Sequence, residues 1–218
     1  NLQDIAEFAR QVLDARTQAR EQALSQARRL TRHSAHAIRA IHRNESSTAQ
    51  ENLDEARKLT ESLRNDLIDD YPDLYFAGYS QDAIKEFAEA SLTRALVADE
   101  ILPTPEELGV EYAAYLKGLA EAAGELRRRC LDILRQGYSE EAERLLGCMD
   151  EIYGVLVTMD YPDAVTSGLR RQTDMVRGVT ERTRGDLTTS LREQKLQATL
   201  EETIAALNDH DQGRNEND

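Results

Sequence analysis

Two short stretches decide how this chain folds: KEFAEA at residues 85–90 and YLKGLAEAAGE at residues 115–125. Each stretch carries two glutamates one helical turn apart, among apolar or small residues. Side chains that are three or four residues apart share one face of a helix. We therefore expect two helices, each of which presents a pair of carboxylates on one face.

The four carboxylates are typical of a site for a hard divalent metal ion. They are Glu86 and Glu89 in the first stretch, and Glu121 and Glu125 in the second. A buried carboxylate is unfavourable unless it is paired, protonated or bound to a cation, and Mg²⁺ and Mn²⁺ select oxygen ligands. The alternative is that these are solvated acids on an acidic protein, because paired glutamates are common on helices.

The composition predicts an all-helical protein, and the length suffices for one large helical domain, which is the organisation that we expect, or for two small ones. The chain has 218 residues, of which 5% are aromatic; tryptophan is absent and only four prolines occur. A chain of this length can bury a sizeable core, and so few helix breakers favour long helices.

The charge is strongly acidic, with a formal net charge of −14, and lysine occurs only at positions 58, 85, 117 and 195. Such a surface stays hydrated in concentrated salt, so a salt-loving source is expected, with ordinary solubility as the alternative. The net charge argues against unaided nucleic-acid binding, but local basic faces matter more than the sum.

Cysteine usage and hydropathy predict a cytoplasmic protein without a membrane partner. Cys130 and Cys148 lie far apart and lack metal-ligand spacing, which fits a reducing compartment. No apolar run approaches membrane-spanning length.

Helical periodicity predicts about seven helices in one bundle over residues 1–207, followed by a disordered polar tail at 208–218. Ser47, Ser80 and Ser139 are candidate N-caps, and Gly185 is expected to break the chain. The expected helices cover roughly 2–43, 47–67, 81–101, 110–136, 140–159, 161–184 and 188–207.

Positive charge gathers on the first predicted helix. Arg28, Arg32, Arg39 and Arg43 are separated by four, seven and four residues, which keeps them on one helix face. A row of guanidinium groups at this spacing can follow a phosphate backbone. The alternative is a subunit contact or a solvated stripe. The full basic set is Arg28, Arg29, Arg32, His33, His36, Arg39, His42 and Arg43.

Several classes of enzyme lack their motifs in this chain. There is no G-x-S-x-G, P-loop or G-x-G-x-x-G sequence, so triad hydrolases, P-loop NTPases and dinucleotide-binding folds are without support. His33 and His36 have no third ligand at zinc spacing, and the absence of Glu-x-x-His argues against a ferritin-like di-iron centre.

The sequence resembles the translin family over nearly its whole length, and most of all the branch of translin-associated factor X. The most specific part is the Y-L-x-G-x-A-x-x-x-G-E-L pattern within YLKGLAEAAGELRR at 115–128. The other matching parts are RHSAHAIRAIHR at 32–43, KEFAEA at 85–90, the segment 138–160 and Arg184-Gly185.

The resemblance implies a bundle of about seven helices that assembles into a hollow oligomeric shell, mostly an octamer. Translin binds single-stranded RNA and DNA, whereas factor X supplies a Mg²⁺-dependent endoribonuclease. Matching the family's motif to this sequence gives Glu86, Glu89, Glu121 and Glu125 as the acids of the nuclease site. Family subunits that bind nucleic acid without cutting it lack this full set. The family usually has Asp in place of Glu121, and glutamate is one methylene longer.

We therefore expect an endoribonuclease that uses Mg²⁺ or Mn²⁺, acts on single-stranded RNA and forms a homo-oligomer. The four glutamates are both its catalytic and its metal-binding residues. Arg32, His33, Arg39, His42 and Arg43 are expected to bind the RNA backbone, and the same groups would also accept DNA.

Two alternatives remain open from the sequence. The first is a non-catalytic shell that binds single-stranded RNA or DNA, in which the acids only pair with Arg127, Arg128 or Arg177. The second is an all-helical nucleotide pyrophosphohydrolase, because enzymes of that class also bind Mg²⁺ through Glu-x-x-Glu pairs on neighbouring helices.

Overall fold

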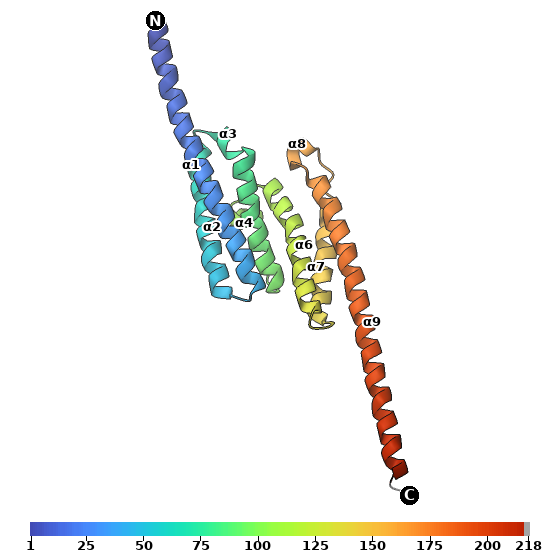
Figure 1. Ribbon diagram of the computed structural model, residues 1–218. Helices are drawn as coiled ribbons and strands as arrows, with labels where there is room; N and C mark the ends of the chain where they lie inside the picture. The colour runs from blue at the N-terminus through green and yellow to red at the C-terminus, as the bar shows by residue number, and fades with distance from the viewer. Residues whose placement is uncertain (216–218) are drawn as a thin grey trace.

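A computed structural model describes the backbone of residues 1–215 and the side chains of residues 1–208. This part of the chain is all-helical, which confirms the expected fold class (Figure 1). Its helices are α1 (Leu2–His42), α2 (Ser46–Leu67), α3 (Pro72–Tyr75), α4 (Gly78–Val97), α5 (Pro105–Leu108), α6 (Tyr112–Leu134), α7 (Glu140–Leu156), α8 (Asp163–Thr166) and α9 (Leu169–Asn215). Six of these helices are long, and three are single turns that begin at or just after a proline.

The expected break at Gly185 is wrong, because α9 runs through it as one continuous helix. A single glycine inside a helix lowers stability by only about 1 kcal/mol, which packing can offset. The break lies earlier, where Ser167 and Gly168 have φ angles of 52° and 87° and separate α8 from α9. Helix α9 extends to Asn215, into the segment 208–218 of the predicted tail. Residues 216–218 lie outside the described part, and disorder of the tail stays a prediction.

One of the three predicted N-caps is confirmed. Ser139 precedes α7, and its side chain accepts a hydrogen bond from the backbone N–H of Glu141. Helix α2 instead follows Glu45, and α4 begins before Ser80, whose hydroxyl donates to the backbone oxygen of Leu74. Ser80 therefore anchors the preceding turn, α3, and caps no helix.

The long helices form two groups of three. In the first, α1, α2 and α4 pack around buried residues such as Leu30, Leu63 and Phe87. In the second, α6, α7 and α9 enclose a separate cluster that includes Leu126 and Met149. Helices α4 and α6 lie side by side at the centre of the bundle and join the two groups (Figure 1).

The contact between α4 and α6 is close because α6 has glycine where the helices meet. A Cβ atom on Gly118 would lie 2.8 Å from the backbone nitrogen of Glu89, 2.9 Å from the Cβ of Ala88 and 3.0 Å from the backbone oxygen of Lys85. Only glycine leaves room for the α4 backbone at this distance. The two glutamate-bearing helices are thereby held in direct backbone contact.

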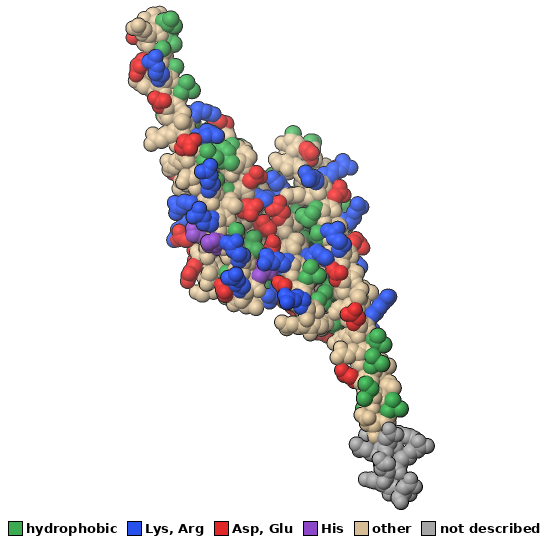
Figure 2. Space-filling model, viewed as in Figure 1, with side chains coloured by type: hydrophobic (Ala, Val, Ile, Leu, Met, Phe, Trp, Pro, Cys, Tyr) green, Lys and Arg blue, Asp and Glu red, His purple; other side chains and the backbone are tan. Residues whose placement is uncertain are grey.

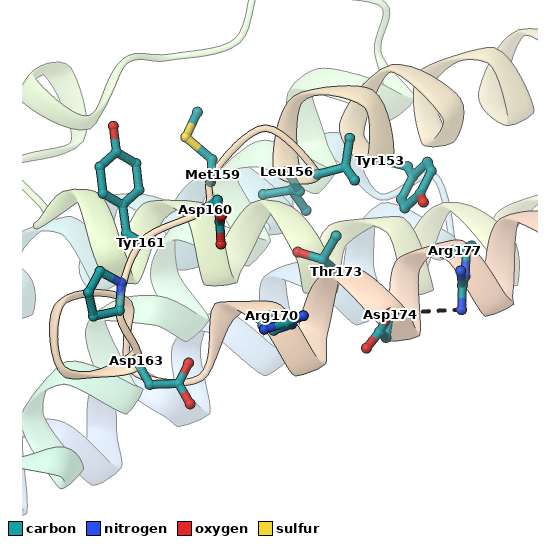
Figure 3. A pocket seen from close by; sticks show the side chains of 12 residues that line it. Tyr153, Leu156, Met159, Asp160, Tyr161, Asp163, Arg170, Thr173, Asp174 and Arg177 are labelled. Atoms are coloured by element: carbon teal, nitrogen blue, oxygen red, sulfur yellow. Dashed lines mark ion pairs between the residues drawn. The ribbon is translucent and has the colours of Figure 1, made fainter.

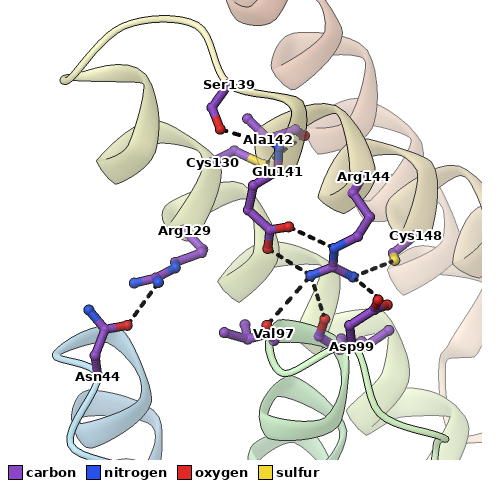
Figure 4. A network of polar contacts seen from close by, with 11 residues as sticks. Asn44, Val97, Asp99, Arg129, Cys130, Ser139, Glu141, Ala142, Arg144 and Cys148 are labelled. Carbon is purple, nitrogen blue, oxygen red and sulfur yellow. Dashed lines mark hydrogen bonds and ion pairs between the residues drawn. The ribbon is translucent and has the colours of Figure 1, made fainter.

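A second connection joins the two groups at the end of α4 (Figure 4). Arg144 of α7 donates to Glu141 on its own helix at 2.7 and 2.8 Å, to Asp99 at 3.1 Å and to the backbone oxygen of Leu96 at 3.1 Å. The guanidinium group thus adds a side-chain donor to a backbone oxygen in the last turn of α4, where the regular helical hydrogen bonds end. This network fixes α7 against the carboxyl end of α4.

No helix in the described part of the chain has both the length and the hydropathy needed to cross a membrane. The expected cytoplasmic location stays a prediction.

Replacement of Gly118 by alanine should destabilise the protein by about 1–3 kcal/mol, because the methyl group must push α4 and α6 apart. The matched control is Gly124→Ala, since a Cβ atom at Gly124 meets nothing within 4 Å. That control should be neutral or stabilising by roughly 0.5–1 kcal/mol. Urea unfolding at one fixed protein concentration compares the two, and equal stability of both variants would contradict the packing argument.

Candidate metal centre and nucleic-acid interface

Three of the four predicted glutamates lie together where α4 meets α6. Glu86 and Glu89 of α4 and Glu121 of α6 each offer a carboxylate oxygen, and these oxygens lie within 4.8 Å of one another. The i, i+3 spacing places the first two on one face of α4. Glu121 follows Gly118 by about one turn, so the close helix contact brings its carboxylate to the same place.

Glu89 is the buried member of this acidic cluster, which we define as Glu86, Glu89 and Glu121. Its residue is only 8% exposed, and no hydrogen bond or ion pair reaches its carboxylate from residues 1–208. Burial, followed by the charges of Glu121 and Glu86, raises the pKa of Glu89 from 4.5 to about 8. The uncharged form is therefore favoured near neutral pH unless a cation is added to the cluster.

Two further side chains hold the cluster, and sequence reasoning missed both. Lys85 forms ion pairs with Glu86, at 2.9 Å, and with Glu121. Gln172 of α9 donates to the other oxygen of Glu121 at 2.8 Å. Burial disfavours the ammonium form, but the hydrogen bonds to Glu121 and Glu86 outweigh it and raise the pKa of Lys85 to about 12. Lys85 precedes Glu89 by four residues, a spacing that could have indicated its position.

Glu125, the fourth predicted glutamate, is not a member of the cluster. Its Oε2 lies 2.5 Å from Nε2 of His42, at the end of α1, and 3.8 Å from the guanidinium of Arg128. Its charge still contributes to the raised pKa of Glu89, so it lies near the cluster. The structure thus places Glu125 beside the acidic cluster, where it pairs with His42.

The basic residues of α1 divide into outward and inward groups. Arg32, Arg39 and Arg43 are exposed. His33 is half-buried and its Nδ1 lies 3.0 Å from the side-chain oxygen of Asn52 on α2, whereas the His42 side chain is only 5% exposed and contacts Glu125. The two histidines therefore make contacts inside the bundle that a backbone-binding role would not require.

The surface around the cluster has a distinct charge pattern (Figure 2). Acidic side chains gather at the centre of this face, with Lys and Arg side chains over α1 on one side and over α9 on the other. Burial and then the nearby charges of Arg39, His33 and Arg32 lower the pKa of His36 on α1. A local basic face thus exists in spite of the net charge of −14.

The arginines that could have neutralised the acids mostly bind elsewhere. Arg127 pairs with Asp186 at 2.9 Å, and Arg177 pairs with Asp174 at 3.9 Å. Only Arg128 approaches one of the predicted acids, at 3.8 Å from Glu125. The idea that the glutamates only form ion pairs with these arginines is therefore wrong for the acidic cluster.

A hollow of about 740 Å³ lies between the end of α7, α8 and the start of α9 (Figure 3). Its wall includes Tyr161, Arg170 and Asp174. None of the nine predicted site residues lines it. The hollow is thus separate from the acidic cluster.

The cluster fits a hard divalent cation. All three donors are carboxylate oxygens, which suit Mg²⁺ or Mn²⁺ better than zinc. The carboxylate of Glu89 is buried without a partner among the described residues, and a bound cation would stabilise its charged form. Within the part of the chain that the structure describes, Lys85 is the cation paired with the cluster, which gives one positive charge for three acids.

The fold and the cluster define an all-helical protein with a candidate centre for a hard metal ion at the meeting of two central helices. No family model matches the sequence. The uncharacterized protein MJ0175 of Methanocaldococcus jannaschii is 32% identical over 183 residues, which are 83% of this chain and 80% of that protein.

Solved structures of C3PO proteins have the same fold. AfC3PO, solved both by itself and as a complex with duplex RNA, is 35% identical with a TM-score of 0.79, over 86% of this chain and 97% of that one. Apo-NeC3PO has a TM-score of 0.76 at 22% identity, over 87% of this chain and 97% of that one, and supports the fold alone. The chain belongs to the C3PO family, which is the translin family that its motifs resemble.

Stability should depend on pH through Glu89. Its pKa is about 8 in the folded chain against 4.5 ordinarily, so the unfolded chain ionises first as the pH rises. Ionisation therefore favours unfolding, and stability should fall between about pH 4.5 and pH 8. Glu89→Gln should remove this part of the decline.

Urea unfolding in EDTA from about pH 5 to pH 8 tests this expectation. The control is Glu61→Gln, which changes an exposed acid on α2. An identical pH dependence in wild type and Glu89→Gln would show that the buried carboxyl is not the cause.

Proposed function

We propose that this protein is a metal-dependent endoribonuclease, most similar to the factor X branch of its family, which cuts RNA at the acidic cluster. The observation that carries the proposal is the convergence of three glutamates from α4 and α6, one of them buried without a partner among residues 1–208. The RNA complex of the relative AfC3PO supports the choice of substrate. None of the relatives named above is described as a nucleotide pyrophosphohydrolase.

In this proposal Glu86, Glu89 and Glu121 hold Mg²⁺ or Mn²⁺. When bound, such a cation stabilises the charge that develops on the phosphate and on the leaving oxygen. Gln172 and Lys85 fix the two oxygens of Glu121 and so orient this longer side chain where the family usually has Asp. Glutamate in place of aspartate is then compatible with a well-defined carboxylate position.

Glu125 has a different role in the proposal, because it lies outside the acidic cluster. Its oxygen is shared with Nε2 of His42, which holds the carboxylate in place at 2.5 Å. We assign to it the acceptance of a proton from the attacking water, the part of a general base. The four glutamates are thus all catalytic residues, with unequal tasks.

The RNA backbone is bound by the exposed arginines of α1 in this proposal. Arg32 and Arg39 lie on α1, and Arg43 directly follows its last residue, His42, which contacts Glu125 next to the candidate centre. Few exposed aromatic side chains are available for base stacking, so weak sequence preference is expected. His33 and His42 act as supports inside the bundle rather than as direct ligands of phosphate.

A homo-oligomeric shell, similar to an octamer, is the proposed assembly. The first turns of α1 and the last turns of α9 project beyond the bundle at opposite ends (Figure 1). Both projections carry exposed apolar residues, which are Leu2, Ile5, Phe8, Val12 and Leu13 on α1, and Leu196, Leu200, Ile204 and Leu207 on α9. Apolar stripes of this kind favour contacts between subunits.

A non-catalytic shell that binds single-stranded RNA or DNA is the second candidate. Binding of RNA without cleavage, whichever metal ion is added, would distinguish this candidate from the nuclease.

The form of the RNA substrate is also part of the proposal. We favour single-stranded RNA, and because the relative AfC3PO was solved with duplex RNA, duplex RNA is the necessary comparison.

Metal-dependent cleavage is the first test. Labelled single-stranded and duplex RNA are incubated with Mg²⁺, with Mn²⁺ or with EDTA, at moderate and at high salt. Internal cuts should occur with metal only, and Glu86→Gln together with Glu89→Gln should lower the rate by at least about 100-fold, since metal catalysis supplies several kcal/mol.

The matched control for cleavage is Glu61→Gln, on the surface of α2, which should cut like wild type. The double variant should keep its oligomeric size and its affinity for RNA. Cleavage by the double variant at the wild-type rate would refute the assignment of the site, and binding without cuts in wild type would favour the non-catalytic shell.

Retention of RNA should depend on the α1 arginines. Changing Arg32, Arg39 and Arg43 to Gln should weaken binding and reduce the slope of log K against log salt by roughly 0.7 for each lost phosphate contact. Filter binding at several salt concentrations measures this slope. Arg192→Gln on α9 is the control, and an unchanged slope in the triple variant would exclude this face.

A further inference from the structure

Lys85 is the one cation that reaches into the acidic cluster among the described residues. Its side chain is 11% exposed, and its ammonium group pairs with Glu86 at 2.9 Å and with Glu121. These two carboxylates come from different helices, α4 and α6. The ammonium therefore bridges the same interface at which a metal ion would be held.

The acids that face this ammonium all belong to the cluster. Glu86 and Glu121 bind it directly, and its charge also acts on Glu89. A buried ammonium needs such partners, because without them its charge would be strongly destabilising. Its side chain is mostly buried in the bundle, and both of its ion pairs are with acids of the cluster.

A pair of catalytic metal ions would compete with this arrangement. Two-metal sites hold their ions about 3.5–4 Å apart and share carboxylates between them. Glu86 and Glu121 are suited to such sharing because they approach from opposite helices, but Lys85 already engages an oxygen of each. A second divalent ion would have to displace a fixed positive charge or lie beside it.

We propose that Lys85 is a specificity-determining residue of the centre: its ammonium occupies one cation position among Glu86, Glu89 and Glu121, so that each chain binds one divalent ion and not two. The inference rests on the proposed function, because it takes the cluster to be the metal site. The single divalent ion and Lys85 together then supply the positive charge that the three acids require.

The test counts Mn²⁺ ions per chain in the intact, folded protein. Isothermal titration calorimetry gives the stoichiometry, and electron paramagnetic resonance reports whether bound ions are coupled, as a pair about 3.5–4 Å apart would be. Weak binding by the acidic surface is subtracted with the Glu86→Gln and Glu89→Gln double variant, which lacks two of the three acids. Circular dichroism checks that each variant is folded.

Wild type should bind one Mn²⁺ per chain, with the signal of an isolated ion. Lys85→Gln should bind two, with a coupled signal. The matched control is Lys117→Gln, a half-buried lysine on α6 that lies 3.7 Å from Asp82 and outside the cluster, and it should bind one. If Lys85→Gln fails to fold, Lys85→Met replaces it, because methionine keeps most of the apolar side chain without the charge, and it should also bind two ions.

The outcomes separate this inference from the proposed function. Two ions in wild type, or one uncoupled ion in Lys85→Gln, would overturn the role of Lys85 and leave the metal site intact. No specific Mn²⁺ in either protein would overturn both, since the cluster would then not be a metal site.

Discussion

The close contact of α4 with α6 at Gly118 is the constraint on which the candidate centre depends. The Lys85 carbonyl, the Ala88 methyl and the Glu89 amide all lie against this glycine, so the two helix backbones meet with no side chain larger than a methyl group between them at this point. Glutamate side chains are short relative to the usual 8–10 Å between helix axes. Carboxylates on the two helices can approach one another only because the helices approach first.

This constraint also explains the electrostatics of the centre. The core clusters of the two helix groups lie on either side of the α4–α6 contact, and Glu89 is buried between them. Burial first, and then the charges of Glu121 and Glu86, raise the pKa of Glu89 to about 8. The fold tolerates these acids through Lys85 and Gln172, and packing of the two helix groups offsets the remaining repulsion.

The sequence predicted the helices and the faces that carry the acids, but not the partners of those acids. Periodicity gives the direction of a side chain from its own helix, so Glu86, Glu89 and Glu121 were found by spacing alone. It does not give the rotation of one helix against another. Contacts such as Gln172 with Glu121 and His42 with Glu125 cross 51 and 83 residues and depend on that rotation.

Helix ends were harder to predict for a related reason. A serine before an apolar run favours a cap, as at Ser139, but Ser80 found a better partner in the backbone of α3. Gly185 was expected to break a helix that packing keeps continuous. At Ser80 an adjacent turn, and at Gly185 packing against other helices, outweighed a local preference of about 1 kcal/mol.

The rotation of α1 then links the basic face to the centre. Successive helical residues are about 100° apart, so Arg32 and Arg39, seven residues apart, share a face of α1, whereas His42, three residues after Arg39, is turned by roughly 60° from that face. The same helix can therefore present arginines to solvent while its last turn inserts a histidine next to Glu125. A phosphate backbone that follows the arginines would be guided toward the end of α1, and the His42–Glu125 contact fixes where that end lies relative to the acidic cluster.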